Sequence, residues 1–189
     1  MAYGRAWICT LFAAVQAMAC MPDTQGVRLI GHGGLGASGA YPMNSAASLF
    51  GALEQGSSGI ELDVQLTRDS VLVAHHGLEL VSGGCTGRVH DHTWSELSQC
   101  ADSMGGEAMF HGVRVDRLLA ECIARYPQAE FTLDLKLNTG GDWWLYLHAI
   151  CARIAELHRI PGLNGRLLVE CQTADLLKVM ALEAPEVST

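Results

Sequence analysis

The chain has 189 residues, of which 49% are hydrophobic and 17% are charged. This composition is typical of a globular protein with one substantial core, and it excludes collagen-like and low-complexity chains. There are 12 lysines and arginines against 20 aspartates and glutamates, giving a net charge of −8. Nucleic acid and anionic membranes are therefore not expected as partners, because binding to either needs a basic surface.

The first 19 residues predict a secretory signal peptide. Arg5 precedes an apolar run, Ala6–Ala14, and the small residues Ala17–Ala19 follow it. The run is too short to span a membrane, which takes about 20 residues. Cys20 comes directly after Ala-Met-Ala, which resembles a bacterial lipobox with Ala17 in place of the usual leucine. We therefore expect export, as a periplasmic or membrane-anchored protein. Lipid attachment at Cys20, simple cleavage, and a buried N-terminal helix remain open.

Export changes how the cysteines are interpreted, because an oxidising compartment permits disulfides. Cys85 lies in a glycine-rich loop and Cys100 at the end of the next predicted helix, so these two are the best candidates for a disulfide. Cys122 and Cys151 fall within apolar helical patterns and are expected to be buried thiols. No CxxC pair is present, so a zinc site is not expected.

Strands and helices are predicted to alternate along the chain. The predicted strands cover residues 27–31, 60–65, 71–74, 130–136 and 167–171. The predicted helices cover residues 45–55, with Asn44 or Ser45 as the cap, and then 93–100, 115–126, 143–157 and 174–184. This order is typical of a parallel α/β fold with right-handed crossovers, in one domain from residue 27 to residue 189.

One strand carries a pair of acids. Its polar residues alternate with apolar ones, so Glu61 and Asp63 share a face and lie about 6–7 Å apart along the backbone. Both carboxylates could reach one hard cation such as Ca²⁺ or Mg²⁺. Taken alone, two such acids on a strand usually only form part of its solvent-exposed face. Here the next predicted strand ends on His75 and His76, so two acids and a histidine pair converge on one region.

At this point the sequence resembles the glycerophosphodiester phosphodiesterase family. The family has a strand of the form IELDVQLTKDG followed by a strand ending in HD, and this chain reads IELDVQLTRDS and then VLVAHHG. The family's HRG, PENT and EIK motifs are similar to LIGHG, PMNS and LDLK here, and its GxVxDxTWxEL is similar to the segment from GRV to TWSEL. The similarity extends from about Val27 to Met180.

The resemblance implies a TIM barrel with its site at the carboxyl ends of the strands. It also implies metal-dependent hydrolysis of a small-molecule glycerophosphodiester to glycerol phosphate and an alcohol, with Ca²⁺ or Mg²⁺ as cofactor. The implied roles are metal binding by Glu61, Asp63 and Asp134, acid–base catalysis by His32 and His76, and contact with a phosphate oxygen by Lys136. His76 is preferred to His75 because the family's histidine is the one that precedes the aspartate.

The chain departs from the family pattern at four positions. Gly33 stands in place of the HRG arginine, Met43 in place of the PENT glutamate, Gly77 in place of the HD aspartate, and Asp134 in place of the EIK glutamate. An alternative interpretation is therefore a catalytically inert exported lipoprotein that uses the barrel as a binding scaffold.

The number of predicted strands is lower than a complete barrel needs. Five strands are predicted, whereas a barrel has eight strands and about 250 residues. We therefore expect a C-terminally truncated member of the family, and we expect little activity from these residues alone. Neither the substrate alcohol nor the oligomeric state follows from the sequence.

Overall fold

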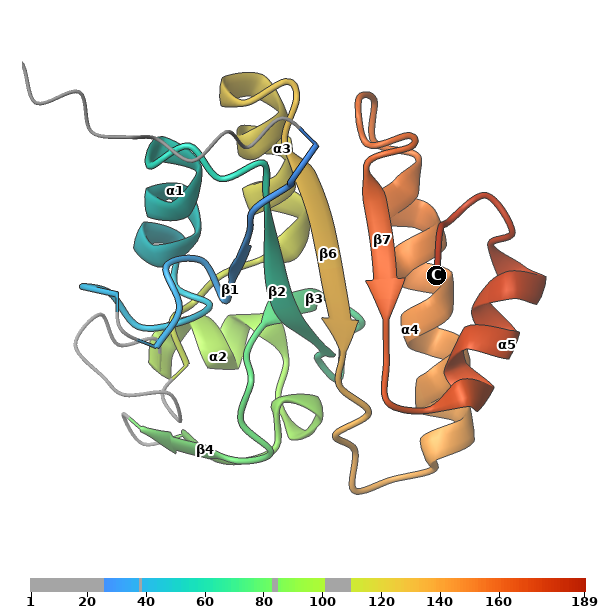
Figure 1. The fold of residues 1–189 in the computed structure, drawn as a ribbon. Coiled ribbons are helices and arrows are strands. Elements are labelled where there is room, and N and C mark those ends of the chain that lie inside the picture. The colour runs from blue at the N-terminus through green and yellow to red at the C-terminus, as the bar shows by residue number, and fades with distance from the viewer. Residues whose placement is uncertain (1–25, 38, 83–84, 101–109) are drawn as a thin grey trace, which may run out of the picture.

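The computed structural model describes residues 26–37, 39–82, 85–100 and 110–189, and it centres on a five-stranded sheet. Four strands are parallel, in the order β1 (Ile30–His32), β2 (Gly59–Leu66), β6 (Glu130–Leu135) and β7 (Leu167–Glu170). The arrows of β2, β6 and β7 point the same way in Figure 1. The predicted parallel α/β fold is confirmed.

The fifth strand, β3 (Leu72–Ala74), differs from the sequence prediction because it pairs antiparallel with β2. The reason is the length of the connection. A parallel pair needs a crossover of about a dozen residues or more, whereas here Leu66 and Leu72 are already partners. The turn between them closes with the N–H of Thr67 donating to the carbonyl of Val71 at 3.0 Å.

The described residues form five α-helices, and all but the second pack against one face of the sheet (Figure 1). They are α1 (Ala46–Glu54), α2 (Trp94–Cys100), α3 (Val115–Arg125), α4 (Trp143–His158) and α5 (Ala174–Glu183). Their bounds match the predicted helices within two residues, and Ser45 is the cap of α1, its Oγ accepting the N–H of Ser48 at 3.2 Å. The sequence did not predict a hairpin of β4 (Leu80–Ser82) and β5 (Cys85–Gly87), or the short 3₁₀ helix η1 (Val89–Asp91).

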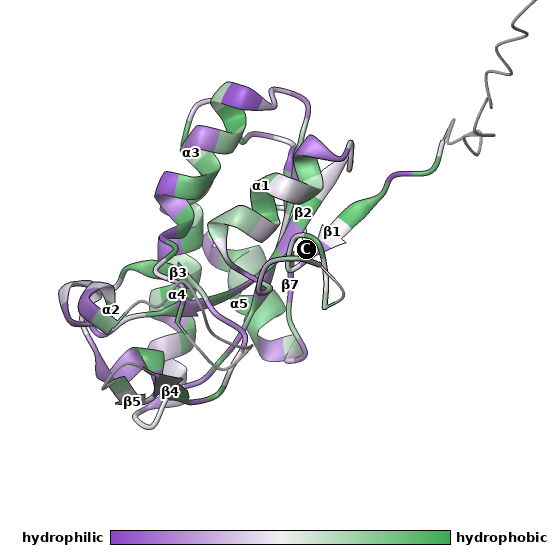
Figure 2. Cartoon of the chain, turned by 90° about the vertical axis from the view of Figure 1, so that its left-hand side faces the viewer, coloured by the Kyte–Doolittle hydropathy of each residue, from purple (hydrophilic) through white to green (hydrophobic). Residues whose placement is uncertain are grey.

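Alternation along β2 divides the sheet into an apolar face and a polar face. Ile60, Leu62, Val64 and Leu66 are fully buried in the main core, together with residues from α1, α3, α4 and α5. In α3 the residues facing this core recur at helical spacing and are Val115, Leu118, Leu119 and Cys122. Figure 2 shows the resulting striping of that helix. The polar residues of β2 point to the opposite face.

The sheet does not close into a barrel within the described residues, and its edges are β1 and β7. Val27 and Leu29, just before β1, are more than half exposed, and Leu168 of β7 is 42% exposed. Leu168 also forms an isolated parallel bridge with Ser188. Among the helices that the structure describes, none is long and apolar enough to cross a membrane.

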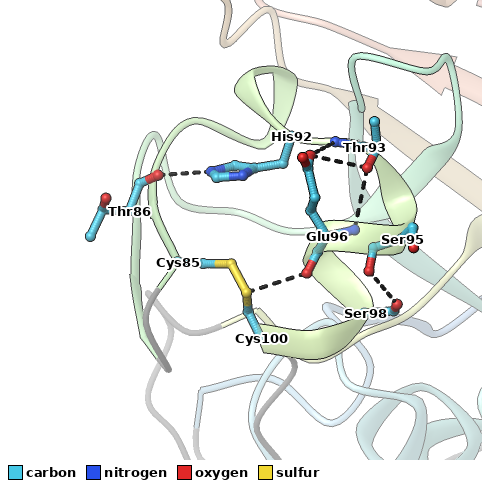
Figure 3. The surroundings of a disulfide bond; sticks show 8 residues. All are labelled: Cys85, Thr86, His92, Thr93, Ser95, Glu96, Ser98 and Cys100. Atoms are coloured by element: carbon cyan, nitrogen blue, oxygen red, sulfur yellow. Dashed lines mark hydrogen bonds between the residues drawn. A yellow bond between two sulfur atoms is a disulfide. The ribbon is translucent and has the colours of Figure 1, made fainter.

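A second, smaller core lies beneath the β4–β5 hairpin and α2. Cys85 and Cys100 form a disulfide there, with their Cα atoms 5.8 Å apart (Figure 3). Cys85 packs with Leu97 and Phe110, and the carbonyl of Glu96 lies 3.3 Å from the sulfur of Cys100. The disulfide thus ties the hairpin to α2. The other described cysteines are free, and Cys122 and Cys151 are buried as predicted.

We expect the double variant Cys85→Ser/Cys100→Ser to lose about 3 kcal/mol of unfolding free energy, since the bond closes a loop of about 15 residues in the unfolded chain. Urea unfolding followed by circular dichroism measures this. Dithiothreitol should destabilise the wild type by a similar amount and leave the double variant unchanged. Equal stability of both proteins in the absence of reductant would contradict the expectation.

Candidate active site

Three carboxylates meet on the polar face of the sheet, two on β2 and one near the carboxyl end of β6. Asp63 and Asp134 are direct partners in the parallel register, and Glu61 lies two residues earlier on the same face of β2. One oxygen from each of these three residues lies within 4.8 Å of the others. Glu61 and Asp63 are buried, and Asp134 is partly buried. The alternation seen in the sequence therefore produces a compact acidic group.

Lys136 supplies a positive charge beside this group. It follows β6, and its backbone N–H continues the pairing by donating to the carbonyl of Val64 at 2.9 Å. Its Nζ lies 2.9 Å from Oδ1 of Asp63 and forms a second ion pair with Asp134. Burial alone would lower the pKa of Lys136, but its contacts with Asp134 and Asp63 outweigh burial and raise it. The lysine is therefore protonated at neutral pH.

Glu61 carries the least compensated charge of the three acids. Burial raises its pKa, the N–H of Gly33 opposes that effect, and the charge of Asp63 raises the pKa further. Its Oε1 is buried and has no hydrogen-bond partner among the described residues. Three carboxylates and one ammonium leave about two negative charges in a buried place, which is costly unless they are paired. Hard oxygen ligands with an unpaired oxygen fit a divalent cation such as Ca²⁺ or Mg²⁺.

His32 is connected to the acidic group through Glu61. It is the last residue of β1 and is paired in register with Glu61, whose Oε2 lies 2.8 Å from its Nδ1. The same oxygen accepts the N–H of Gly33 at 2.9 Å. The His32 side chain is largely exposed, so the carboxylate fixes one ring nitrogen and leaves the other accessible.

A pocket of about 250 Å³ lies beside the acidic group. It is lined by His32, Ala37, Met43, Asn44 and His76. Both histidines that the resemblance selected therefore face one cavity. Met43 contributes a thioether, which is not a ligand that Ca²⁺ or Mg²⁺ uses.

Gly33 and Met43 fit each other sterically. A Cβ at position 33 would lie 2.6 Å from the Cε atom of Met43, and Gly33 has a φ of +56°. The two departures from the family motifs are therefore coupled, because Met43 occupies the space that a side chain at position 33 would need.

His75 and His76 have different environments. The side chain of His75 is buried, with 2% of the residue exposed, and the backbone N–H of His75 donates to the carbonyl of Asp63 at 3.0 Å. Burial, with the charges of His111 and His76, lowers the pKa of His75 to about 4, so its ring is neutral at neutral pH. Its ring packs against Phe110 at a centroid distance of 6.1 Å. His76 is exposed and lines the pocket. The structure thus separates a core histidine from a pocket histidine.

Asn44 is a site residue that the sequence analysis considered only as a helix cap. It is 2% exposed and has a φ of +62°. Its Nδ2 donates to Oδ2 of Asp63 at 2.7 Å, and its Oδ1 accepts the backbone N–H of Asp63 at 3.0 Å. Asn44 therefore fixes the orientation of the Asp63 carboxylate. The available signal was the asparagine itself, which tolerates the left-handed conformation better than most residues do.

The fold and the site define an α/β protein of the incomplete TIM-barrel type, with a histidine-lined pocket next to an acidic group on the polar face of its parallel strands. A model of the Glycerophosphoryl diester phosphodiesterase family matches residues 35–189, so the chain belongs to this family. The resemblance inferred from the motifs is confirmed.

Curated relatives agree with this assignment. The chain is 25% identical over 153 residues to the uncharacterized protein YqiK of Bacillus subtilis, covering 80% of this chain and 61% of that protein. It is 32% identical over 107 residues to a glycerophosphodiester phosphodiesterase of Caldanaerobacter subterraneus, covering 56% of this chain and 43% of that protein. The chain thus spans less than two thirds of the length of these relatives.

Solved structures have the same fold. The glycerophosphodiester phosphodiesterase of Agrobacterium tumefaciens aligns with a TM-score of 0.66 at 25% identity, covering 85% of this chain and 64% of that one. A phosphodiesterase of Oleispira antarctica, solved in complex with its product sn-glycerol-3-phosphate, aligns with a TM-score of 0.67 at 23% identity, covering 85% and 63%.

We expect Glu61→Gln to stabilise the metal-free protein at pH 7 by about 1 kcal/mol, because it removes a poorly compensated buried charge. Since the folded pKa of Glu61 is raised, its contribution to stability is present below the unfolded value of 4.5 and is lost as pH rises through the folded pKa. The gain from glutamine should therefore disappear as the pH falls below 4.5. Urea unfolding at several pH values measures it.

The matched control for this variant is Glu186→Gln, which changes an exposed glutamate of ordinary environment. It should leave the unfolding free energy unchanged at every pH. A Glu61→Gln protein that is less stable than the wild type at pH 7 would show that the Glu61 charge is fully compensated in the fold.

Proposed function

We propose that this chain carries the catalytic groups of an enzyme that hydrolyses glycerophosphodiesters to glycerol phosphate and an alcohol. The observation that carries the proposal is that His32 and His76 line one pocket, and that the pocket residues His32 and Asn44 contact Glu61 and Asp63 of the acidic group that Asp134 completes. Family membership supports the same reaction class. The product bound in the Oleispira phosphodiesterase supports a small glycerol-containing substrate.

Phosphodiester cleavage needs three things: charge neutralisation at phosphorus, an activated nucleophile and a protonated leaving group. A divalent cation, Ca²⁺ or Mg²⁺, held by Glu61, Asp63 and Asp134, would supply the first by offsetting the charge of the phosphate. Lys136 adds a permanent ammonium beside the acids, and in this proposal it holds a phosphate oxygen.

His32 and His76 divide the proton transfers in this proposal. One imidazole accepts the proton of the attacking hydroxyl, from water or from a neighbouring glycerol hydroxyl. In the second case a cyclic phosphate forms, and water then opens it to glycerol phosphate. The other donates a proton to the oxygen of the leaving alcohol as the bond from phosphorus to that oxygen breaks. Glu61 orients His32 through Nδ1, so the accessible nitrogen of His32 is Nε2.

We expect His32→Ala and His76→Ala each to lower kcat by about 10²–10⁴-fold, the usual contribution of a positioned acid or base. The assay follows release of choline from glycerophosphocholine with Ca²⁺ or Mg²⁺, and addition of EDTA should abolish turnover. It is run on this chain and on a version extended by any residues that the gene encodes after Thr189.

His148→Ala is the matched control, because His148 lies on α4 and pairs with Glu183 away from the pocket. It should retain wild-type kcat. An active protein in which both pocket histidines are dispensable would refute the proposed roles of His32 and His76. An extended protein without turnover would refute the proposal that the protein is an enzyme.

A second candidate function is a binding scaffold without catalysis. The observation that favours it is the coupled pair Gly33 and Met43, which leaves an uncharged wall where the family motifs carry an arginine and a glutamate. Calorimetric binding of glycerophosphocholine by a protein that does not turn it over would identify this function.

Export and lipid attachment at Cys20 complete the proposal and concern residues outside those that the structure describes. The pattern of residues 1–20 supports both. The disulfide between Cys85 and Cys100 supports export alone, since disulfides persist in oxidising compartments. Metabolic labelling with radioactive palmitate in a bacterial host, with Cys20→Ser as control, tests the attachment.

A further inference from the structure

Gln65 is the polar residue of β2 to which the proposed mechanism gives no role. It follows Glu61 and Asp63 on the same face of the strand, and its side chain is fully buried. A buried amide costs free energy unless its hydrogen-bonding groups are satisfied. Its partners therefore indicate what the residue stabilises.

Both partners of the Gln65 amide nitrogen are backbone carbonyls. Nε2 donates to the carbonyl of His75 at 2.8 Å and to the carbonyl of Gly77 at 2.8 Å. Carbonyl oxygens only accept, so the side chain must present its NH₂ group to them. These two carbonyls lie on either side of His76, and one buried amide therefore fixes the backbone before and after the pocket histidine.

Other contacts among the described residues lie before and after His76. The pairing of β3 with β2 ends at Ala74, and the N–H of His75 then donates to the carbonyl of Asp63. Beyond His76, a side chain of Asn138 reaches the carbonyl of Gly77 at 3.4 Å. Gly77 itself passes close to the ring of His75, because a Cβ there would lie 3.0 Å from its Nε2. The two hydrogen bonds from Gln65 are therefore a substantial part of what holds the backbone around His76.

We propose that Gln65 is a positioning residue for His76. This inference rests on the proposed function, in which His76 transfers a proton in the pocket. The imidazole of His76 is exposed, so the backbone on either side of it, and not packing of its ring, sets its place. A catalytic group must be held to within about 0.5 Å, and the two hydrogen bonds of Gln65 are suited to that task.

The test is a double-mutant cycle between Gln65→Leu and His76→Ala. Leucine keeps most of the side-chain volume and removes both donors. We expect Gln65→Leu to lower kcat by about 10²-fold with little change in KM. A loss of that size is the usual cost of displacing a catalytic group by about 1 Å. In the His76→Ala background the same change should have almost no further effect on kcat, because the group that Gln65 positions is gone.

Two controls separate positioning from general destabilisation. Gln128→Leu makes the same chemical change at an exposed turn before β6 and should leave kcat unchanged. Ile150→Val removes a methylene from the buried core of α4, so it lowers stability away from the pocket. It should lower the midpoint of urea unfolding without changing kcat.

A second readout does not depend on turnover. Amide ¹⁵N relaxation of His76 and Gly77 should show added motion in Gln65→Leu, while the amides of β2 stay rigid. Equal relaxation in the two proteins would overturn the inference, and so would equal, additive losses of kcat from Gln65→Leu in both backgrounds. A wild-type protein without turnover would refute the proposed function and leave the relaxation test to decide the role of Gln65.

Discussion

The parallel register of β2 with β6 is the constraint on which the site depends. It places Asp63 directly beside Asp134, and neighbouring strands are only about 4.8 Å apart. Two carboxylates on one face at that separation repel each other, and Glu61 adds a third on the same face. Lys136, two residues after Asp134, is the only cation that the sheet itself brings to this group among the described residues. The electrostatics of the site thus follow from strand pairing.

Burial of these charges is tolerated because the opposite face of the same strand is wholly apolar. The four hydrophobic residues of β2 that are fully buried anchor it in the main core. Each buried aliphatic side chain contributes about 1.5–3 kcal/mol, which offsets an unfavourable polar face. A shift by one residue would therefore place its apolar side chains on the polar face and its acids in the apolar core.

Two neutral amides support the charged groups without adding to the charge. Asn44 uses its donor and its acceptor on Asp63, and Gln65 uses its donors on the carbonyls around His76. An ionised side chain in either place would add repulsion or need a counter-ion of its own. An amide offers both donor and acceptor at no net charge.

The sequence predicted those features that depend on local periodicity. The helices, the strands and the shared face of Glu61 and Asp63 all follow from spacing within one segment. The antiparallel direction of β3, the β4–β5 hairpin and the contacts of Asn44 and Gln65 were not predicted. These depend on where the chain returns in space, and short apolar runs carry no information on strand direction.

Gly33 and Met43 show how the pocket differs from the family motifs while the local packing is preserved. Compared with those motifs, the chain lacks one positively charged side chain at position 33 and one negatively charged side chain at position 43. The net charge of these two positions is therefore unchanged. The thioether of Met43 fills the space above Gly33, and Ala37 continues this apolar wall. His32 and His76 line the same pocket. Under the proposed function, the permanent positive charge for a phosphate comes from Lys136 or from a cation held by the three carboxylates, as far as the described residues extend. In the proposed reaction, charge recognition thus rests on the acidic group with its lysine, and proton transfer rests on the two histidines that line the pocket.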